Sequence, residues 1–203
     1  MVGESLAAWV QDVIQSFGYA GVALLMLVEN LFPPIHSEVI LPLTGFLVEE
    51  GSLMFLPALV VATAGSLVGA LIIYALGRWG GRELILRHGR VLRLKEADLD
   101  RADDWFDRYG GAVVLFGRMV PGVRSLVSVP AGLSEMPLGR FVLLTTLGSG
   151  AWNALLIGAG WLLGENWSRV AGVVGSVSNV VLAILAIAAV LLGVWWWRSR
   201  DIR

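Results

Sequence analysis

The sequence predicts an all-α integral membrane protein that forms a single membrane domain over residues 1–203. Its composition is 57% hydrophobic and only 15% charged, with a mean hydropathy of +0.76, whereas soluble domains carry about 25% charged residues. Short apolar segments interrupted by proline alternate with apolar runs long enough to cross a bilayer. The basic residues are strongly segregated, because residues 1–77 contain no Lys or Arg.

The composition also narrows the chemistry that the chain can perform. There is no cysteine, so disulfides and thiol nucleophiles are excluded, and two histidines, His36 and His88, do not make a typical zinc site. We therefore expect no metal and no cofactor. The net charge of −1 gives no reason to expect a nucleic-acid partner.

Residues 1–18 are predicted to form an amphipathic helix lying at the membrane interface. Apolar side chains recur at helical spacing and leave a polar opposite face; they are Leu6, Trp9, Val10, Val13, Ile14 and Phe17. An ordinary packing helix explains the same pattern equally well.

Residues 19–77 are predicted to form a first structural repeat. Two apolar arms, 19–28 and 39–48, flank the polar stretch Glu29–Glu38 with its Pro33-Pro34 pair. Each arm has about ten residues, half of the roughly 20 that a spanning helix needs, so a re-entrant hairpin is predicted. One broken helix that crosses once is the alternative. A spanning helix over 54–76 follows.

Residues 78–109 are predicted to form a cytoplasmic loop that ends in a charged surface helix over 95–109. This loop contains eight basic residues, and the C-terminal tail contains three more; the tail residues are Arg198, Arg200 and Arg203. Under the positive-inside rule, both the loop and the C-terminus face the cytoplasm.

Residues 110–164 are predicted to form a second repeat of the same kind. The arm 111–116 meets the element Arg118-Met-Val-Pro121-Gly122-Val-Arg124, a second arm covers 126–133, and a spanning helix follows at 138–163. A C-terminal transmembrane helix at 172–197 ends in three tryptophans before Arg198, which is an aromatic belt with a basic anchor.

The two repeats match in the order of their elements and in the spacing of their glycines. The matched glycines are 83 residues apart; they are Gly65, Gly77 and Gly81 in the first repeat and Gly148, Gly160 and Gly164 in the second. The predicted sidedness makes the two hairpins enter the membrane from opposite sides. Inverted repeats with broken helices are typical of transporters.

Four charged residues fall at the tips of the predicted hairpins. The first repeat supplies Glu29 and Glu38, and the second supplies Arg118 and Arg124. A charge at membrane depth is costly and therefore indicates function. Arginine suits phosphate, while glutamate exchanges a proton when burial neutralises it. This predicts a site for an anionic headgroup; a buried ion-pair clamp between the hairpins is the alternative.

Four further polar residues are secondary candidates for the site. A proton-transfer role is considered for His36, against a structural hydrogen-bonded role that has at least equal weight. Polar packing is the favoured interpretation for Ser125, Ser128 and Asn153, with headgroup contact second.

The motifs resemble those of the DedA family, whose domain is also called the VTT or SNARE-associated domain. The resemblance covers residues 15–165 and is carried by the stretch Glu29–Gly45, the segment Gly65–Arg78, the element Phe116–Arg124 and the Pro130-Ala-Gly132 turn. It implies a bacterial, multi-pass cytoplasmic-membrane protein of the lipid-transporter type. It also implies that the family's essential acids correspond to Glu29 and Glu38, and its essential arginines to Arg118 and Arg124. In some members the second acid is an aspartate further along the chain.

This resemblance predicts a translocase, not an enzyme, for a phosphate-bearing membrane lipid, with undecaprenyl phosphate as the first candidate and proton coupling as an option. The alternatives are a phospholipid scramblase or flippase, a proton-coupled exchanger of small ions, an enzyme acting on lipid headgroups, and a structural protein. A homodimer is left open.

Overall fold

The computed structural model describes residues 2–32, 37–81 and 96–166, together with isolated positions between 169 and 187. The predictions for His36, for loop residues 82–95 and for most of the helix at 172–197 therefore lie outside the described residues. The described segments are helical and contain no strand, which confirms the all-α class. The elements are α1 (Val2–Phe17), α2 (Tyr19–Leu31), α3 (Ser37–Glu49), α4 (Phe55–Leu76), the π-helical turn η1 (Gly77–Gly81), α6 (Glu96–Gly117), α7 (Ser128–Leu133), α8 (Leu138–Leu163) and the 3₁₀ turn η2 (Gly164–Asn166).

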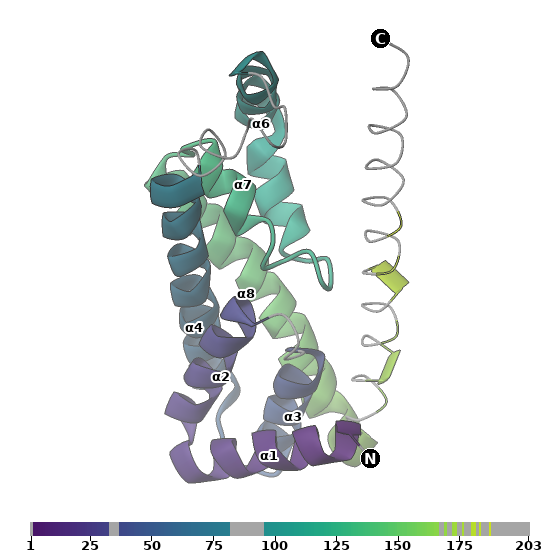
Figure 1. Cartoon of the computed structure of the whole chain (residues 1–203). Coiled ribbons are helices and arrows are strands. Elements are labelled where there is room, and N and C mark those ends of the chain that lie inside the picture. The colour runs from purple at the N-terminus through teal and green to yellow at the C-terminus, as the bar shows by residue number, and fades with distance from the viewer. Residues whose placement is uncertain are drawn as a thin grey trace.

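Helix α1 lies across one end of the molecule (Figure 1). Val10 and Ile14 on one of its faces are buried against the core, whereas Trp9 and Phe17 are exposed. The predicted helix at the N-terminus is therefore confirmed, with its apolar residues divided between core and surface.

The helices α2 and α3 form a pair that occupies the same end of the molecule as α1. In Figure 1, α2 rises from that end to about halfway along the molecule, and α3 returns to it. Each helix has 13 residues, so at about 1.5 Å per residue neither is long enough to span a bilayer alone.

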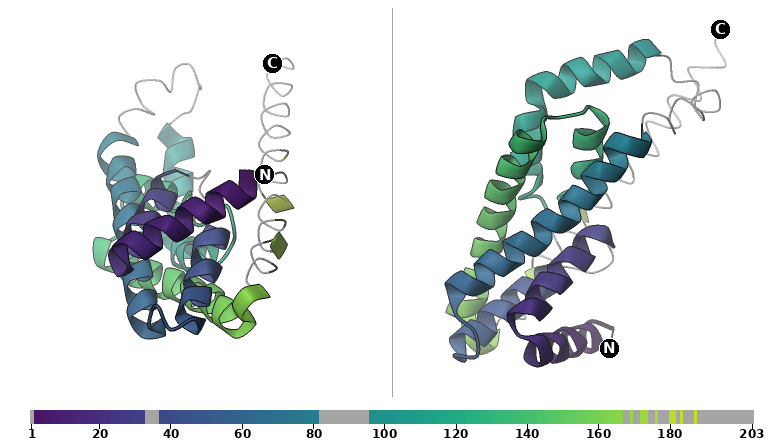
Figure 2. Two further views of the ribbon diagram at one scale, coloured as in Figure 1. Left: turned by 90° about the horizontal axis from the view of Figure 1, so that it is seen from below. Right: turned by 90° about the vertical axis from the view of Figure 1, so that its left-hand side faces the viewer.

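A second pair, α6 and α7, occupies the opposite end. The first turns of α6 lie across that end, and its later turns run down beside α8 to a turn over 118–127 (Figures 1 and 2). One continuous helix thus covers both the charged helix predicted at 95–109 and the first arm of the second hairpin. Gly110-Gly111 does not end the helix, because a helical glycine costs only about 1 kcal/mol relative to alanine. Gly111 has no side chain, and this leaves room for the guanidinium of Arg140, whose Nη2 would lie 2.6 Å from a Cβ at this position.

Glycines allow four helix pairs to pack backbone against backbone. A Cβ at Gly45 of α3 would collide with the carbonyl oxygen of Ile157 in α8, and one at Gly160 of α8 would collide with that of Pro42. The α7–α4 contact depends in the same way on Gly132. Comparable contacts join α4 to α2 and α8 to α6; they involve Gly65 against Ala23, and Gly148 against Leu115 and Arg118. Small residues at such crossings are typical of membrane helix packing.

The outer surface of the long helices is more apolar than that of a soluble domain, and several polar side chains are buried among apolar ones. Large apolar side chains on the outer faces of α4 and α8 are exposed; they include Leu56, Val60, Leu76, Leu143, Leu155 and Leu162. Polar side chains point inward, among them Ser66, Thr145, Ser149 and Asn153. The segments Phe55–Gly80 and Leu138–Asn166 are long and apolar enough to cross a membrane. Extended apolar surface around a polar interior fits a lipid environment.

The glycine contacts predict that Gly45→Ala and Gly160→Ala destabilise the fold. Alanine normally favours a helix over glycine, but here its Cβ would meet backbone atoms that cannot move aside. We expect each variant to lose about 1–3 kcal/mol of unfolding free energy in detergent, as overpacked cores do. The matched control is Gly139→Ala in α8, where a Cβ meets nothing within 4 Å. Equal stability of all three variants would show that α3 and α8 are not closely packed.

Candidate functional site

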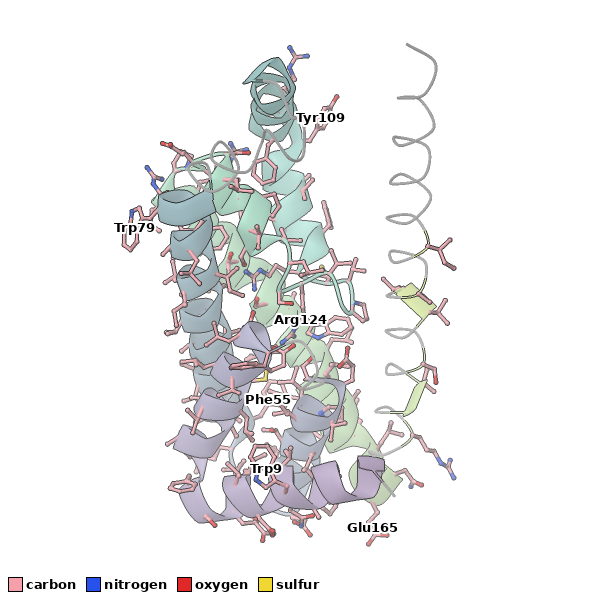
Figure 3. The ribbon with its side chains drawn as sticks, in the orientation of Figure 1. Trp9, Phe55, Trp79, Tyr109, Arg124 and Glu165 are labelled. Atoms are coloured by element: carbon pink, nitrogen blue, oxygen red, sulfur yellow. The ribbon has the colours of Figure 1, made fainter. Side chains whose placement is uncertain are left out.

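The structure buries all four of the predicted site residues near the middle of the helical body. Glu29 lies near the end of α2 and Glu38 in the first turn of α3, while Arg118 follows α6 and Arg124 lies in the turn over 118–127. Figure 3 places Arg124 about halfway between the two ends. Their exposed fractions are 6%, 4%, 1% and 4%, in the order given. Each charge is therefore removed from solvent and depends on its neighbours for stabilisation.

Arg124 and Glu29 form a two-pronged ion pair. Arg124 Nε donates to Glu29 Oε1 at 3.1 Å, and Arg124 Nη2 donates to Glu29 Oε2. The planar guanidinium fork matches a carboxylate in this geometry, which makes charge-assisted hydrogen bonds strong and directional. The pair joins the end of α2 to the turn after α6.

Asn30 connects this ion pair to the second arginine. Its Nδ2 donates to Glu29 Oε2 at 3.2 Å and to the Met26 carbonyl oxygen at 3.0 Å, and its Oδ1 accepts from Arg118 Nη1 at 3.3 Å. Gly69 of α4 allows this approach, since a Cβ there would come within 2.6 Å of Asn30 Cβ. Sequence reasoning did not assign a role to Asn30. Its position next to Glu29, in a helix otherwise apolar over 19–28, was the available signal.

Arg118 is the most deeply buried of the four charges, and its described hydrogen bonds go to neutral groups. Besides Asn30, its Nη2 donates to Ser128 Oγ at 2.5 Å. Its guanidinium carbon lies 5.9 Å from the centre of the Phe141 ring, a cation–π distance. In the described part of the chain, Arg118 Nε has no hydrogen-bond acceptor. A buried guanidinium with an unused donor has unmet capacity for an anion.

Glu38 is close to this cluster but is not paired with either arginine. Its charge acts on Glu29, as do those of Arg118 and Arg124, and the two arginines also repel each other. Among the described residues, no hydrogen bond or ion pair joins Glu38 to Arg118 or Arg124. Two acids and two arginines therefore share one low-dielectric region, with one direct ion pair between them.

The secondary candidates separate into different environments. Ser128, the first residue of α7, contacts Arg118, as described above. Ser125 is buried in the turn over 118–127. Asn153 lies elsewhere: its Nδ2 donates to Thr63 Oγ1 at 3.2 Å across the α4–α8 interface. His36 lies outside the described residues.

Sequence reasoning also missed Phe141, because nothing in the sequence pattern distinguishes this residue from the other apolar residues of α8.

Comparison with known families shows to which family the chain belongs. A family model described as the VTT domain matches residues 32–162, well over half of the chain, a range that includes Glu38, Arg118 and Arg124 and begins just after Glu29 and Asn30. The chain belongs to the VTT-domain family. The predicted DedA relationship is thereby confirmed.

Curated relatives of this VTT-domain protein come from several bacteria. It is 46% identical over 185 residues to an "Alkaline phosphatase-like protein" of Lactococcus lactis subsp. cremoris, covering 89% of this chain and 86% of the relative. Two proteins named "Undecaprenyl phosphate transporter A" are also similar. The one from Bacillus subtilis is 34% identical over 91% of this chain and 92% of its own length, and the one from Staphylococcus aureus is 32% identical over 94% and 96%. No solved structure matches.

These relatives and the two membrane-capable helices make this VTT-domain protein a bacterial membrane protein. Its exposed apolar surface and its buried charges are both accounted for by that environment.

The ion pair predicts a strong energetic coupling between Arg124 and Glu29. Arg124→Gln leaves a buried carboxylate and Glu29→Gln leaves a buried guanidinium, so each should cost about 3–5 kcal/mol of unfolding free energy. The double variant removes both charges and should cost much less than the sum of the two. Denaturation in detergent measures all three, with Arg108→Gln on the exposed part of α6 as the control expected to change stability by less than about 0.5 kcal/mol. Simple additivity would contradict the pairing.

Proposed function

We propose that this chain is a lipid translocase that moves a phosphate-bearing lipid across the bacterial cytoplasmic membrane, with undecaprenyl phosphate as its cargo. The observation that carries this proposal is Arg118, a fully buried guanidinium bonded to Asn30 and Ser128 and with an unused Nε donor. A dianionic headgroup offers several acceptor oxygens to such a fork. The names of the Bacillus and Staphylococcus relatives support this cargo.

In the proposed mechanism, the headgroup enters at Arg118 and then competes with Glu29 for Arg124. Arg124 turns its two donors from the carboxylate to the phosphate, so the phosphate gains a second guanidinium. Glu29 then loses its cation, and taking up a proton removes the cost of a buried unpaired carboxylate. Return of the Arg124–Glu29 pair releases both the proton and the headgroup. Glu38 contributes a second negative charge that opposes prolonged binding.

We propose, further, that the two helix pairs are re-entrant hairpins of inverted repeats and that the site lies where their tips meet. The reciprocal glycine contacts support this: Gly45 of α3 packs on α8 next to Gly160, and Gly132 of α7 packs on α4 next to Gly77. The opposed ends from which α2–α3 and α6–α7 approach are consistent with it (Figure 1). The long tails of the cargo would remain in lipid outside the exposed apolar faces of α4 and α8.

The inverted architecture predicts opposite sidedness for the two ends of the molecule. Because the chain contains no cysteine, a single introduced cysteine can be labelled without background from native thiols. We expect a membrane-impermeant maleimide to label Ser52→Cys, in the turn between α3 and α4, on intact cells. It should label Gly139→Cys, at the start of α8, only after permeabilisation. Labelling of both positions from one side would rule out hairpins that enter from opposite faces.

The receptor role of Arg118 predicts that Asn30→Asp strongly lowers transport. The substitution is nearly isosteric and supplies Arg118 with a carboxylate, which satisfies the cation that the headgroup would otherwise bind. Charge-assisted hydrogen bonds contribute about 1.5–3 kcal/mol, so transport of undecaprenyl phosphate in proteoliposomes should fall about tenfold or more. Because Asn30→Asp also loses the Nδ2 hydrogen bonds to Glu29 and to the Met26 carbonyl oxygen, thermal stability is measured on the same samples, and Asn30→Gln serves as the neutral control for altered side-chain shape.

The same proteoliposomes distinguish this function from its alternatives. A fluorescent phospholipid in parallel vesicles reports scrambling, and released inorganic phosphate reports the headgroup hydrolysis that the Lactococcus relative's name suggests. Full transport by Asn30→Asp, or phosphate release at the rate of lipid loss, would overturn the proposal.

A further inference from the structure

Besides the cluster of four buried charges, the described residues form a cavity. A cavity of about 610 Å³ is located at the end of the molecule opposite α1, between α4, η1 and the connection from α7 to α8. That volume is within the range of small-molecule binding sites. Its lining is mainly apolar but includes one cation and one acid; it contains Leu71, Ala75, Arg78, Trp79, Glu135 and Leu138.

Arg78 is held in this cavity by an aromatic hydroxyl. Its Nη1 donates to the hydroxyl oxygen of Tyr74 at 2.7 Å, and that hydroxyl donates to the Met136 carbonyl oxygen at 2.5 Å. The guanidinium is therefore oriented before any ligand arrives. The close approach of α7 to α4 at Gly132, where a side chain would strike the Tyr74 carbonyl, fixes the wall that carries Met136.

The acid partner of Arg78 is weakly engaged. Arg78 Nη2 lies 3.8 Å from Glu135 Oε2, and the two side chains are 36% and 60% exposed. Exposed ion pairs at such a distance contribute little stability. A phosphate, with several strong acceptor oxygens, can therefore displace Glu135 from the guanidinium.

The surroundings indicate an amphipathic ligand. Leu71 and Ala75 lie on the apolar helix α4, and Leu138, at the start of α8, is 53% exposed. Trp79 is 82% exposed and lies at the outer edge of this end of the molecule (Figure 3). Tryptophan and arginine at the end of an apolar span are typical of the bilayer interface. The cavity thus offers one cation at headgroup level and an apolar wall at the level of the lipid tail.

We propose that this cavity is a docking site for the phosphate of a single lipid in the leaflet on the α6 side of the membrane. Arg78 binds the phosphate in place of Glu135, and the first part of the tail lies along Leu71 and Leu138. The lipid class rests on the proposed function. The site is next to the central one, because Tyr74 stacks on Phe141 with ring centres 4.5 Å apart and Phe141 in turn contacts Arg118.

The docking site is tested by binding to the full-length chain in nanodiscs of a zwitterionic lipid. An environment-sensitive fluorophore on Gly139→Cys reports from the rim, where added atoms meet nothing nearby. The ligands are geranylgeranyl phosphate, its parent alcohol geranylgeraniol and inorganic phosphate. We expect a saturable response to the first alone, since the alcohol lacks the charge and the free ion lacks the tail. Equal responses to the phosphate and the alcohol would overturn the proposal, and a response to inorganic phosphate alone would assign the cavity to a soluble anion.

Substitutions of the ion pair separate ligand binding from a structural role. Arg78→Gln should weaken binding about tenfold, the loss expected for one charge-assisted contact, and Arg78→Lys should restore part of it. Glu135→Gln should strengthen binding about threefold, because it removes the competing carboxylate. If the Arg78–Glu135 ion pair had only a structural role, Glu135→Gln would weaken binding instead of strengthening it. Both Glu135→Gln and Arg78→Gln would then lower the melting temperature, and this result would refute the site.

Transport measured on the same variants keeps the two proposals apart. If the wild-type protein transports the lipid while the rim probe gives no saturable signal, the docking site is refuted and the proposed function stands. If the probe responds with the expected signs but the wild-type protein moves no lipid, the docking site stands and the proposed function fails. Arg108→Gln should leave the rim response unchanged, since Arg108 is exposed on α6 and does not line this cavity.

Discussion

The structure depends on the cost of burying charge. Four ionisable side chains share an interior in which an isolated ion is prohibitively unstable, and within the described part of the chain Glu29 and Arg124 form the one direct ion pair among them. Arg118 is stabilised by Asn30, Ser128 and the face of Phe141, all of them neutral. Such an arrangement stabilises the cation enough for the protein to fold but leaves capacity for an anionic ligand. In the mechanism that we propose, the pair that stabilises the fold is also the pair that is exchanged during transport.

Close helix packing makes this arrangement possible. Asn30 reaches Arg118 because Gly69 lets α2 approach α4, and Arg118 reaches the interior because Gly148 presents no side chain to it. The glycines at the α3–α8 and α7–α4 crossings hold the two helix pairs against the long helices in the same way. Without a hydrophobic driving force between helices in lipid, this dispersion contact and the interior hydrogen bonds supply most of the association energy.

Much of this organisation was predictable because its physical causes are local in sequence. Apolar length and proline placement predicted the helices α4 and α8 and the two shorter pairs, and the cost of membrane-embedded charge singled out Glu29, Glu38, Arg118 and Arg124. Which acid meets which arginine could not be predicted, since Glu29 and Arg124 are 95 positions apart and their contact is set by tertiary packing. The roles of Asn30 and Phe141 were not predicted for a related reason. Both roles depend on neighbours supplied by other helices, and neither residue belongs to a sequence pattern of its own.

The proposed function requires that a lipid phosphate bind directly to the buried arginines. In the Arg78→Gln variant reconstituted in bilayers, dipolar recoupling between ³¹P of a bound polyprenyl phosphate and ¹⁵N-labelled arginine guanidinium groups measures this contact without a contribution from Arg78. We expect a coupling that corresponds to direct hydrogen bonding, reduced in Arg118→Gln and in Arg124→Gln and retained in Arg108→Gln. A coupling that persists unchanged when Arg118 and Arg124 are both replaced, or no coupling in a preparation that transports the lipid, would contradict the account.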